Sequence, residues 1–264
     1  MAILCTNISF TYNVAQSVLQ GISFKLEKGK TLAIVGASGC GKSTLLRILS
    51  GILTNYKGEI SIDGLTPDQY RQTGKLAFMF QEATLMPHLT VKQNIELPLK
   101  IKGNTNEQKI INLIKAVGLE EYSSYLPKQL SGGMKTRVAL ARSFSTNPEL
   151  LLLDEPFSAL DIAWKSKLYA ELEKLREETD TTVIVVTHDV QEALLLADHV
   201  IVMNSFGGIE TIKEIKSECS IMQRVNNISG YMNSVYENYL LPIQDAIMNG
   251  QNKKNEKQDI IHIA

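Results

Sequence analysis

The chain has 264 residues, enough for one large domain or two small ones, and a formal net charge of -1. The composition, 44% hydrophobic and 21% charged, is that of an ordinary soluble globular protein, and the near-neutral charge gives no case for a nucleic-acid partner held by bulk charge. The three cysteines, Cys5, Cys40 and Cys219, are too scattered for a disulfide framework or a zinc site, which fits a reducing compartment.

The start of the chain carries no targeting signal that we can identify. "MAILCTNISF" lacks a basic segment followed by an apolar run, so the sequence predicts no signal peptide. No stretch approaches the roughly 18 consecutive apolar residues of a membrane helix. We therefore expect that the chain does not cross a bilayer itself, although it can dock onto a protein that does.

The first half of the chain alternates between strand and helix patterns. Ile22, Phe24 and Leu26 lie at every second position and predict one buried face of a strand. The elements predicted for this half are strands over 21–27 and 31–35, a helix over 42–53, strands over 58–64 and 75–81, and mostly helical chain from about 90 to 145, with a helix stop at Gly118.

The segment "GASGCGKST" (Gly36 to Thr44) matches the phosphate-loop pattern G-x-x-x-x-G-K-[ST]. Glycines let the backbone curl so that several N–H groups point at an anion, and the helix behind the loop adds its positive end. Lys42 is expected to reach the β- and γ-phosphates, and the Ser43 hydroxyl to take a place on Mg²⁺. A glycine turn without a ligand is disfavoured by the full match between a strand and a helix. The expected nucleotide-binding residues here are Gly36, Ala37, Ser38, Gly39, Cys40, Gly41, Lys42, Ser43 and Thr44.

A second phosphate-binding pattern follows in "LSGGMKTRVALAR", which begins at Leu130. Ser131, Gly132 and Gly133 stand at the start of a predicted helix, where N–H groups and the helix dipole favour an anion. Glycine lets a ligand approach the backbone closely. One small protein therefore presents two phosphate sites.

Two dense apolar runs, 150–155 and 182–188, predict buried parallel strands, with a charged helix over about 161–179 between them. The alternation of strands and helices predicts an α/β fold, a parallel sheet covered by helices. The helical stretch in the middle of the chain is expected to be an insertion.

Polar groups follow several of these predicted strands. If the strand over 150–155 continues, Asp154 and Glu155 point in opposite directions, and they need different roles. Asp154 suits Mg²⁺ held through water, and Glu155 suits polarisation of an attacking water. His188 ends the next strand and is expected to hydrogen-bond the γ-phosphate or that water, and Gln81 offers an amide for Mg²⁺ or water.

The character of the chain changes after Asn204, where polar segments with weak periodicity begin. A short helix is expected around 231–247, interrupted by Pro242. The composition of the last dozen residues predicts disorder. No function is assigned to this tail.

Over about Ile3 to Asn204 the chain resembles the ATP-binding subunit of an ABC transporter. The matching motifs, in order, are Tyr12 (the aromatic that stacks on adenine), "GASGCGKST" (Walker A), Gln81 (Q-loop), "LSGGM" (signature), "LLLLDE" (Walker B), "SALD" from Ser158 to Asp161 (D-loop) and His188 (switch histidine). A phosphate loop alone is shared by many nucleotide hydrolases, whereas the signature, D-loop and switch histidine together are highly specific.

The resemblance implies a P-loop NTPase (RecA-like) core with an N-terminal antiparallel β subdomain and an inserted α-helical subdomain. Residues 1–204 would form the ATP-binding domain, with the insert at about 85–146 and a tail over 205–264. Glu155, His188, Gln81 and Lys42 would be catalytic, with ATP and Mg²⁺ bound and Ser43, Gln81 and Asp154 near the metal.

The resemblance also explains the second phosphate site. Two such domains face each other head to tail, so Ser131, Gly132 and Gly133 would contact the ATP of the partner. Asp161 of the D-loop is also expected among the nucleotide-binding residues. The partner would be a second copy or a related ATPase. Membrane permease subunits and, indirectly, a solute-binding protein would complete the assembly at the cytoplasmic face of the membrane, with no nucleic acid.

The resemblance favours a bacterial importer of the nitrate, sulfonate and taurine type, which includes carriers of thiamine pyrimidine precursors. That group commonly has Trp where this chain has His88, which is more similar to sugar, polyamine or iron importers. The 205–264 tail is too short for the regulatory domain of those proteins. The family commonly has Gln before Arg137 of the signature helix, and this chain has Thr136.

Three other functions stay open. The chain could serve lipid or peptide export, which uses the same motifs. A P-loop kinase or GTPase is disfavoured by the signature and the D-loop. A non-catalytic interaction module is disfavoured by the intact Lys42, Asp154, Glu155 and His188.

Overall fold

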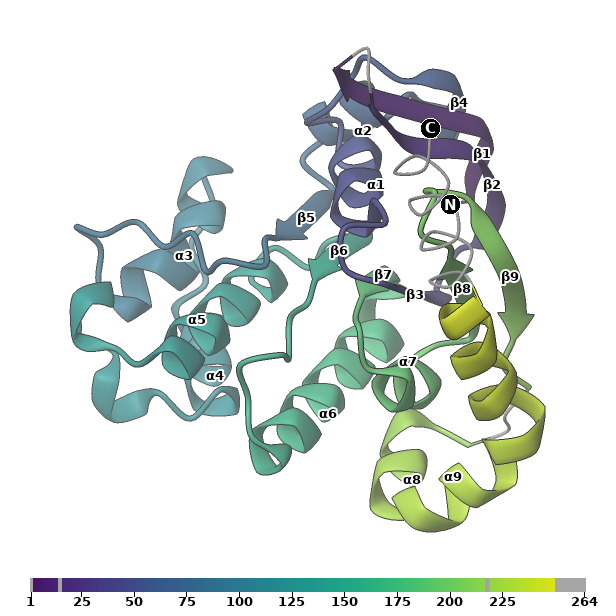
Figure 1. Ribbon diagram of the computed structural model, residues 1–264. Helices are drawn as coiled ribbons and strands as arrows, with labels where there is room; N and C mark the ends of the chain where they lie inside the picture. The colour runs from purple at the N-terminus through teal and green to yellow at the C-terminus, as the bar shows by residue number, and fades with distance from the viewer. Residues whose placement is uncertain (1, 14–15, 217–218, 250–264) are drawn as a thin grey trace.

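The computed structural model describes residues 2–13, 16–216 and 219–249, which form two sheets and the helices that cover them (Figure 1). The first elements are β1 (Ala2–Asn13), β2 (Gln16–Glu27), β3 (Thr31–Gly36), α1 (Lys42–Leu49), β4 (Lys57–Ile62), α2 (Pro67–Gln72) and β5 (Leu76–Met79). A helical region follows with α3 (Val91–Ile101), α4 (Glu107–Ala116), the 3-10 helices η1 (Glu120–Tyr122) and η2 (Pro127–Gln129), and α5 (Gly132–Phe144). The last elements are β6 (Leu150–Asp154), α6 (Ile162–Thr179), β7 (Thr182–Val186), α7 (Val190–Leu196), β8 (His199–Met203), β9 (Ile209–Glu214), α8 (Ile221–Asn226), α9 (Ile228–Val235) and the π-helical turn η3 (Tyr236–Leu240).

The larger sheet has six strands in the order β5-β6-β7-β3-β8-β9. All neighbouring strands are parallel except β9, which runs antiparallel to β8 at one edge. A separate antiparallel sheet, β2-β1-β4, is built from the start of the chain. The predicted α/β class, with an N-terminal antiparallel sheet and a helical insert, is confirmed.

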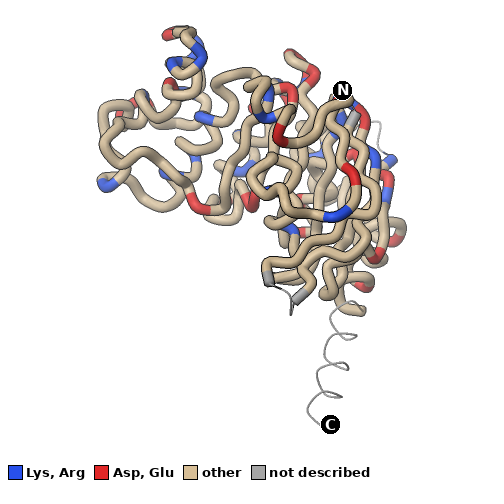
Figure 2. The backbone as a smooth tube through the Cα atoms, turned by 90° about the horizontal axis from the view of Figure 1, so that it is seen from above, with Lys and Arg blue, Asp and Glu red and all other residues tan. Residues whose placement is uncertain are grey.

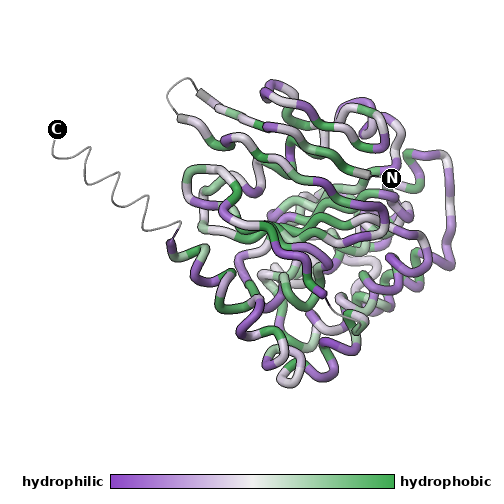
Figure 3. The backbone as a smooth tube through the Cα atoms, turned by 90° about the vertical axis from the view of Figure 1, so that its right-hand side faces the viewer, coloured by the Kyte–Doolittle hydropathy of each residue, from purple (hydrophilic) through white to green (hydrophobic). Residues whose placement is uncertain are grey.

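The two faces of the larger sheet are covered by different parts of the chain. On β6, Leu150 and Leu152 belong to a core shared with α1 and the antiparallel sheet, whereas Leu151 and Leu153 belong to a core shared with α5, α6 and α7. Alternate residues of a strand point to opposite faces, so a strand buried on both sides is apolar throughout. Figure 3 shows these central strands as the most hydrophobic part of the molecule.

The helical insert lies between β5 and β6 and begins with a fixed loop. Thr90 and Gln93 form a reciprocal capping box that starts α3. The fully buried Asn94 donates to the carbonyls of Met86 and Leu89 and accepts the Met86 N–H. The loop around Met86 and Leu89, which follows Gln81 in the chain, is therefore attached to α3 by a buried side chain.

The charges agree with the near-neutral composition. Lys and Arg are interspersed with Asp and Glu along the described backbone, as seen from above (Figure 2). None of the described helices is both long enough and apolar enough to span a membrane.

The segment after Asn204 is more ordered than its sequence indicates. Strand β9 continues the larger sheet. Ile215 directly after it, and Ile221 and Ile243 of the following helices, are buried in the core shared with α6 and α7. The expected interruption at Pro242 is wrong, because the helix continues to residue 249. The π-helical turn η3 ends two residues before Pro242, in the backbone that a proline's missing N–H and bulky ring disturb.

The predicted division at residue 204 therefore falls between two paired strands of one sheet, and it stays a prediction. The expected disorder of the last dozen residues concerns positions outside the described part of the chain.

Candidate nucleotide site

The phosphate loop joins the central strand β3 to α1, in the position that the sequence predicts. Gly41 has φ +103°, and a Cβ there would lie 2.7 Å from Leu19 Cδ2, so only glycine fits the turn into the helix. At Gly39 a Cβ would meet nothing within 4 Å, which leaves open space over the loop. The loop thus has the shape of an anion cradle at a helix start.

Lys42 closes this loop on itself. Its Nζ donates to the carbonyls of Gly36 and Ala37, at 2.8 and 3.0 Å. The side chain is buried beside Cys40, whose Sγ lies 4.0 Å from Nζ. A buried ammonium held at the loop centre supplies the positive charge that a phosphate requires.

Ser43 and Asp154 form a pair of hard oxygen donors. The Ser43 hydroxyl donates to Oδ1 of Asp154 over 2.9 Å, although 111 residues separate them. Burial raises the pKa of Asp154, and the Ser43 hydrogen bond opposes that rise. A buried carboxylate next to a hydroxyl suits a hard cation such as Mg²⁺. Among the described residues no three His, Cys, Asp or Glu side chains gather as metal ligands, so the fit to a metal depends on this pair.

Glu155 does not continue the strand as expected. β6 ends at Asp154, and Glu155 has φ +47°, a left-handed conformation that is unusual for a residue with a side chain. Its N–H still donates to the carbonyl of Val186 at the end of β7. This turn directs the carboxylate toward groups from two other segments.

Gln81 and His188 both contact the same oxygen of Glu155. Nε2 of Gln81 lies 3.5 Å from Oε2, and Nδ1 of His188 lies 3.2 Å from it. The three residues follow β5, β6 and β7, and the carboxyl ends of neighbouring parallel strands meet at one edge of a sheet. The His188 side chain is 62% exposed and Glu155 20%, so the cluster opens to solvent.

Tyr12 lies at the border of the loop. Its hydroxyl is 3.3 Å from Oγ1 of Thr44, and its ring packs edge-on against Phe10. Half of Tyr12 remains exposed. The ring therefore presents an exposed surface near the start of α1, where the family resemblance implies stacking on adenine.

The signature residues lie apart from the loop. No described hydrogen bond or ion pair joins Ser131, Gly132 or Gly133 to residues 36–44. Ser131 caps α5 by accepting the Met134 N–H, and a Cβ on Gly132 would meet nothing within 4 Å. The start of α5 is thus open toward solvent.

The D-loop residue Asp161 has a structural role of its own. Its Oδ1 accepts the N–H of Trp164 and so caps α6. A contact between Asp161 and a nucleotide stays a prediction.

A buried network beside the site was missed by sequence reasoning. Glu192, at 3% exposure, accepts from the Tyr169 hydroxyl at 2.9 Å and pairs with Lys165 at 3.3 Å. Burial, and then the charge of Glu192, raises the pKa of Tyr169. The signal was present in "VQEALLL", where one charged residue stands within an apolar helix pattern.

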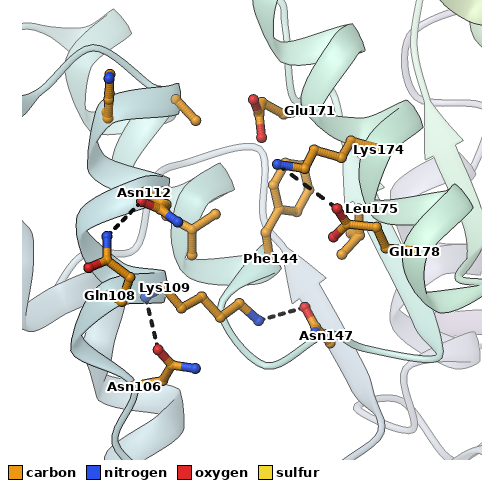
Figure 4. A pocket seen from close by; sticks show the side chains of 13 residues that line it. Asn106, Gln108, Lys109, Asn112, Phe144, Asn147, Glu171, Lys174, Leu175 and Glu178 are labelled. Atoms are coloured by element: carbon orange, nitrogen blue, oxygen red, sulfur yellow. Dashed lines mark hydrogen bonds and ion pairs between the residues drawn. The ribbon is translucent and has the colours of Figure 1, made fainter.

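A cavity of about 770 Å³ lies elsewhere, between α4 and α6 (Figure 4). Lys109 reaches across it and donates to Oδ1 of Asn147, and Phe144 lies on its wall. None of the predicted nucleotide residues lines it. The cavity is a seam between the insert and the rest of the molecule, distinct from the nucleotide site.

Three features define a P-loop nucleoside triphosphatase: a strand that ends in a phosphate loop, a buried Asp154 carboxylate hydrogen-bonded to Ser43, and a mostly parallel sheet. Comparison with known proteins narrows the class. The family model for the ABC transporter matches residues 19–158, so the chain belongs to the ABC transporter family and is an ABC-type transport ATPase.

Several relatives support this assignment. The aliphatic sulfonates import ATP-binding protein of Bacillus cereus is 42% identical over 193 residues, which cover 72% of this chain and 75% of that protein. A protein of the same name from Pseudomonas syringae is 45% identical over 74% of this chain and 79% of its own length. The sulfate/thiosulfate import ATP-binding protein of Gloeobacter violaceus is 40% identical over 80% of this chain and 62% of its own.

A solved dimeric structure of an ATP-binding cassette, in a post-hydrolysis state with ADP and Pi, is similar with a TM-score of 0.75. It is 32% identical, and the match covers 81% of this chain and 99% of that one. The predicted family is therefore confirmed.

Proposed function

We propose that Glu155 is the general base of ATP hydrolysis in this chain and that the turnover drives import of a small solute through membrane subunits. The observation that supports the first part is the meeting of Gln81 and His188 on one oxygen of Glu155. A carboxylate held by two polar neighbours at the carboxyl edge of the sheet, beside a phosphate loop, can accept a proton from an attacking water.

The other residues of the site bind and orient. Lys42 and the loop N–H groups hold the β- and γ-phosphates, and Tyr12 stacks on adenine. His188 hydrogen-bonds the γ-phosphate or the attacking water. Gln81 orients that water or contacts the metal.

The oxygens of Ser43, Asp154 and Gln81 would hold Mg²⁺, with Asp154 acting through water. When bound there, the metal would supply positive charge against the phosphates. The raised pKa of Asp154 supports this role, because a buried carboxylate gains from a nearby cation.

The signature supports a head-to-tail pair with a second copy or a related ATPase. Packing within this chain does not require glycine at position 132, since a Cβ there would meet nothing within 4 Å. The open start of α5 is suited to the phosphates of a partner's ATP. The similar cassette of known structure is also dimeric.

For the transported solute we propose an aliphatic sulfonate or a related oxyanion. The support is the printed function of relatives that are 42% and 45% identical to this chain. The chain would then dock on permease subunits at the cytoplasmic face of the membrane, with a solute-binding protein beyond them. The His88 departure keeps the sugar, polyamine and iron importers as an alternative.

Phosphate release by the purified chain tests the base. Glu155→Gln should lower kcat by about 100-fold or more while ATP still binds, because the amide cannot take the proton. Glu149→Gln, which removes a surface carboxylate paired with Lys75, is the matched control and should keep its rate. Near-normal turnover of Glu155→Gln would remove Glu155 from this role.

Growth tests the solute. A strain of the organism that encodes this chain, with the gene deleted, should fail to grow on ethanesulfonate as sole sulfur source. The wild-type chain should restore growth, and Glu155→Gln should not. Unchanged growth would exclude sulfonate import. Accumulation of a lipid or peptide inside the mutant would favour export instead.

A further inference from the structure

The C-terminal segment is attached to α6 and α7 by polar contacts as well as by apolar packing. At the start of α8 the N–H groups of Ile221 and Met222 both donate to the carboxylate of Glu173, on α6. These N–H groups have no partner within their own helix. Glu173 therefore ties the first turn of the tail helices to α6.

Arg224 makes the second attachment, at the end of α7. It is only 6% exposed, and its Nη1 donates to the carbonyls of Leu194, Leu195 and Ala197 at 3.4, 3.2 and 3.2 Å. The Tyr231 hydroxyl donates to the Leu194 carbonyl at 2.9 Å. The last carbonyls of a helix lack intrahelical partners and carry its negative dipole end, so a buried guanidinium stabilises them.

Helix α7 depends on such support, because it has only seven residues. A helix of this length is marginal on its own and needs packing from its surroundings. Figure 1 shows the tail helices α8 and α9 lying beside α7, at the opposite end of the molecule from the antiparallel sheet.

The other ends of α6 and α7 carry residues of the site. Asp161 of the D-loop caps α6, and Asp189, next to His188, caps α7. The buried Glu192 joins the two helices, since it contacts Lys165 and Tyr169 of α6. A displacement of α7 along its axis would move His188 relative to Glu155.

We propose that Ile221–Asn249 acts as a positioning clamp for ATP hydrolysis, with Arg224 as its central positioning residue. Arg224 acts through α7 on the orientation of His188, and Glu173 fixes the same clamp to α6. The inference rests on the proposed role of His188 at the nucleotide site. It gives the C-terminal segment a part in turnover, although no described hydrogen bond or ion pair joins that segment to a predicted nucleotide residue.

The test compares full-length wild type, Arg224→Met and Arg224→Lys at a temperature where all three are folded. Arg224→Met keeps the aliphatic stem and loses the donors, so kcat should fall about fivefold with KM for ATP within about twofold, as for a catalytic group that is misplaced but present. Arg224→Lys should recover at least half of the lost rate. Arg71→Met, at an exposed arginine of α2, is the matched control and should leave kcat unchanged.

Histidine resonances supply the readout that a purely stabilising role would not move. The chain has four histidines, and the signal of His188 is assigned by its loss in His188→Ala. Arg224→Met should shift the His188 signal and leave that of His88, in the insert, in place. If Arg224→Met does not fold, Glu173→Gln tests the same clamp and should lower kcat about twofold with the same shift of His188.

The outcomes separate the two proposals. If His188→Ala loses activity while Arg224→Met keeps both its kcat and its His188 signal, the clamp is wrong and the proposed site stands. A loss of kcat that only follows the folded fraction also overturns the clamp. If His188→Ala keeps the wild-type rate, the role of His188 is wrong, and the clamp fails with it.

Discussion

Thr136 lies in the first turns of the signature helix and is bonded back to the helix start. Its Oγ1 donates to the carbonyl of Gly132 at 3.2 Å, and the residue is 9% exposed. Such a bond to the carbonyl four residues earlier slightly destabilises a helix and often bends it. Thr136 therefore binds a carbonyl of the first helical turn, which the side chain of Gln would leave free.

Thr136→Gln should raise the ATPase rate about two- to threefold and leave ATP affinity unchanged, because Gln is a better helix former and frees the Gly132 carbonyl. Phosphate release at saturating ATP measures the rate, and ATP binding measured by titration checks the affinity. Thr136→Ser keeps the bond to the Gly132 carbonyl and serves as the control. An unchanged rate in Thr136→Gln would make the position neutral.

At the scale of elements, the insert contacts α6 at Trp164, where the guanidinium of Arg137 lies over the indole ring. Arg137 of α5 donates to the carbonyl of Val117 at the end of α4, and its guanidinium lies 3.9 Å from the centre of the Trp164 ring. Gly118, with φ +58°, faces the same ring, which a Cβ there would overlap. Helices α4, α5 and α6 thus meet around the Trp164 ring.

Gly118→Ala should destabilise the protein by about 1–3 kcal/mol more than Gly103→Ala, because overpacking against Trp164 adds to the backbone cost. Gly103 is the matched control, since its φ is +70° but a Cβ there meets nothing within 4 Å. Urea unfolding followed by the fluorescence of Trp164, the single tryptophan of the chain, measures both. Equal losses in the two variants would show that the ring moves aside freely.

The elements that the sequence predicts well are those with a strong local pattern. β3, β6 and β7 are apolar throughout, and α6 starts at a capping Asp161 where the charged helix was expected. β9 was missed because it is an edge strand whose residues are all half-buried or exposed, which weakens the alternation. The sequence predicts less order in the tail helices than the structure shows. Their attachment to α7 depends on the buried Arg224, and a sequence pattern does not show that a charged residue will be buried.

The same distinction applies to the site. The residues Lys42, Ser43 and Asp154 follow from motifs, and the structure brings the last two into contact. The left-handed turn at Glu155 did not follow from a strand pattern, because it depends on pairing with β7.

At the scale of the whole molecule, the seam between the insert and the remaining chain contains a half-buried lysine. Burial lowers the pKa of Lys109 from its ordinary 10.5 to about 8 (Figure 4). Between these values the folded protein has released the proton that the unfolded chain still holds. Because the unfolded state binds more protons there, the free energy of unfolding gains from Lys109 as pH rises from about 8 to 10.5.

Lys109→Met removes this dependence. The difference in stability, wild type minus Lys109→Met, should therefore be flat below about pH 8 and rise up to pH 10.5. Thermal unfolding of the two proteins over this pH range measures the difference and cancels groups that titrate in both. Lys128→Met, at an exposed lysine of the insert, is the control, and its difference in stability from wild type should not change over this pH range. A difference that falls with pH would contradict the burial of the ammonium.

The left-handed backbone at Glu155 has a consequence for evolution. A side chain held in that conformation costs about 1 kcal/mol or more, and glycine relieves the cost. Glu155→Gly should therefore melt at a higher temperature than Glu155→Ala while both lose turnover, which melting curves of the two variants would show. Selection for thermal stability alone would drive this position away from glutamate. Only glycine relieves this cost, so a chain that keeps Glu155 retains the strain of the turn together with the proposed role of its carboxylate.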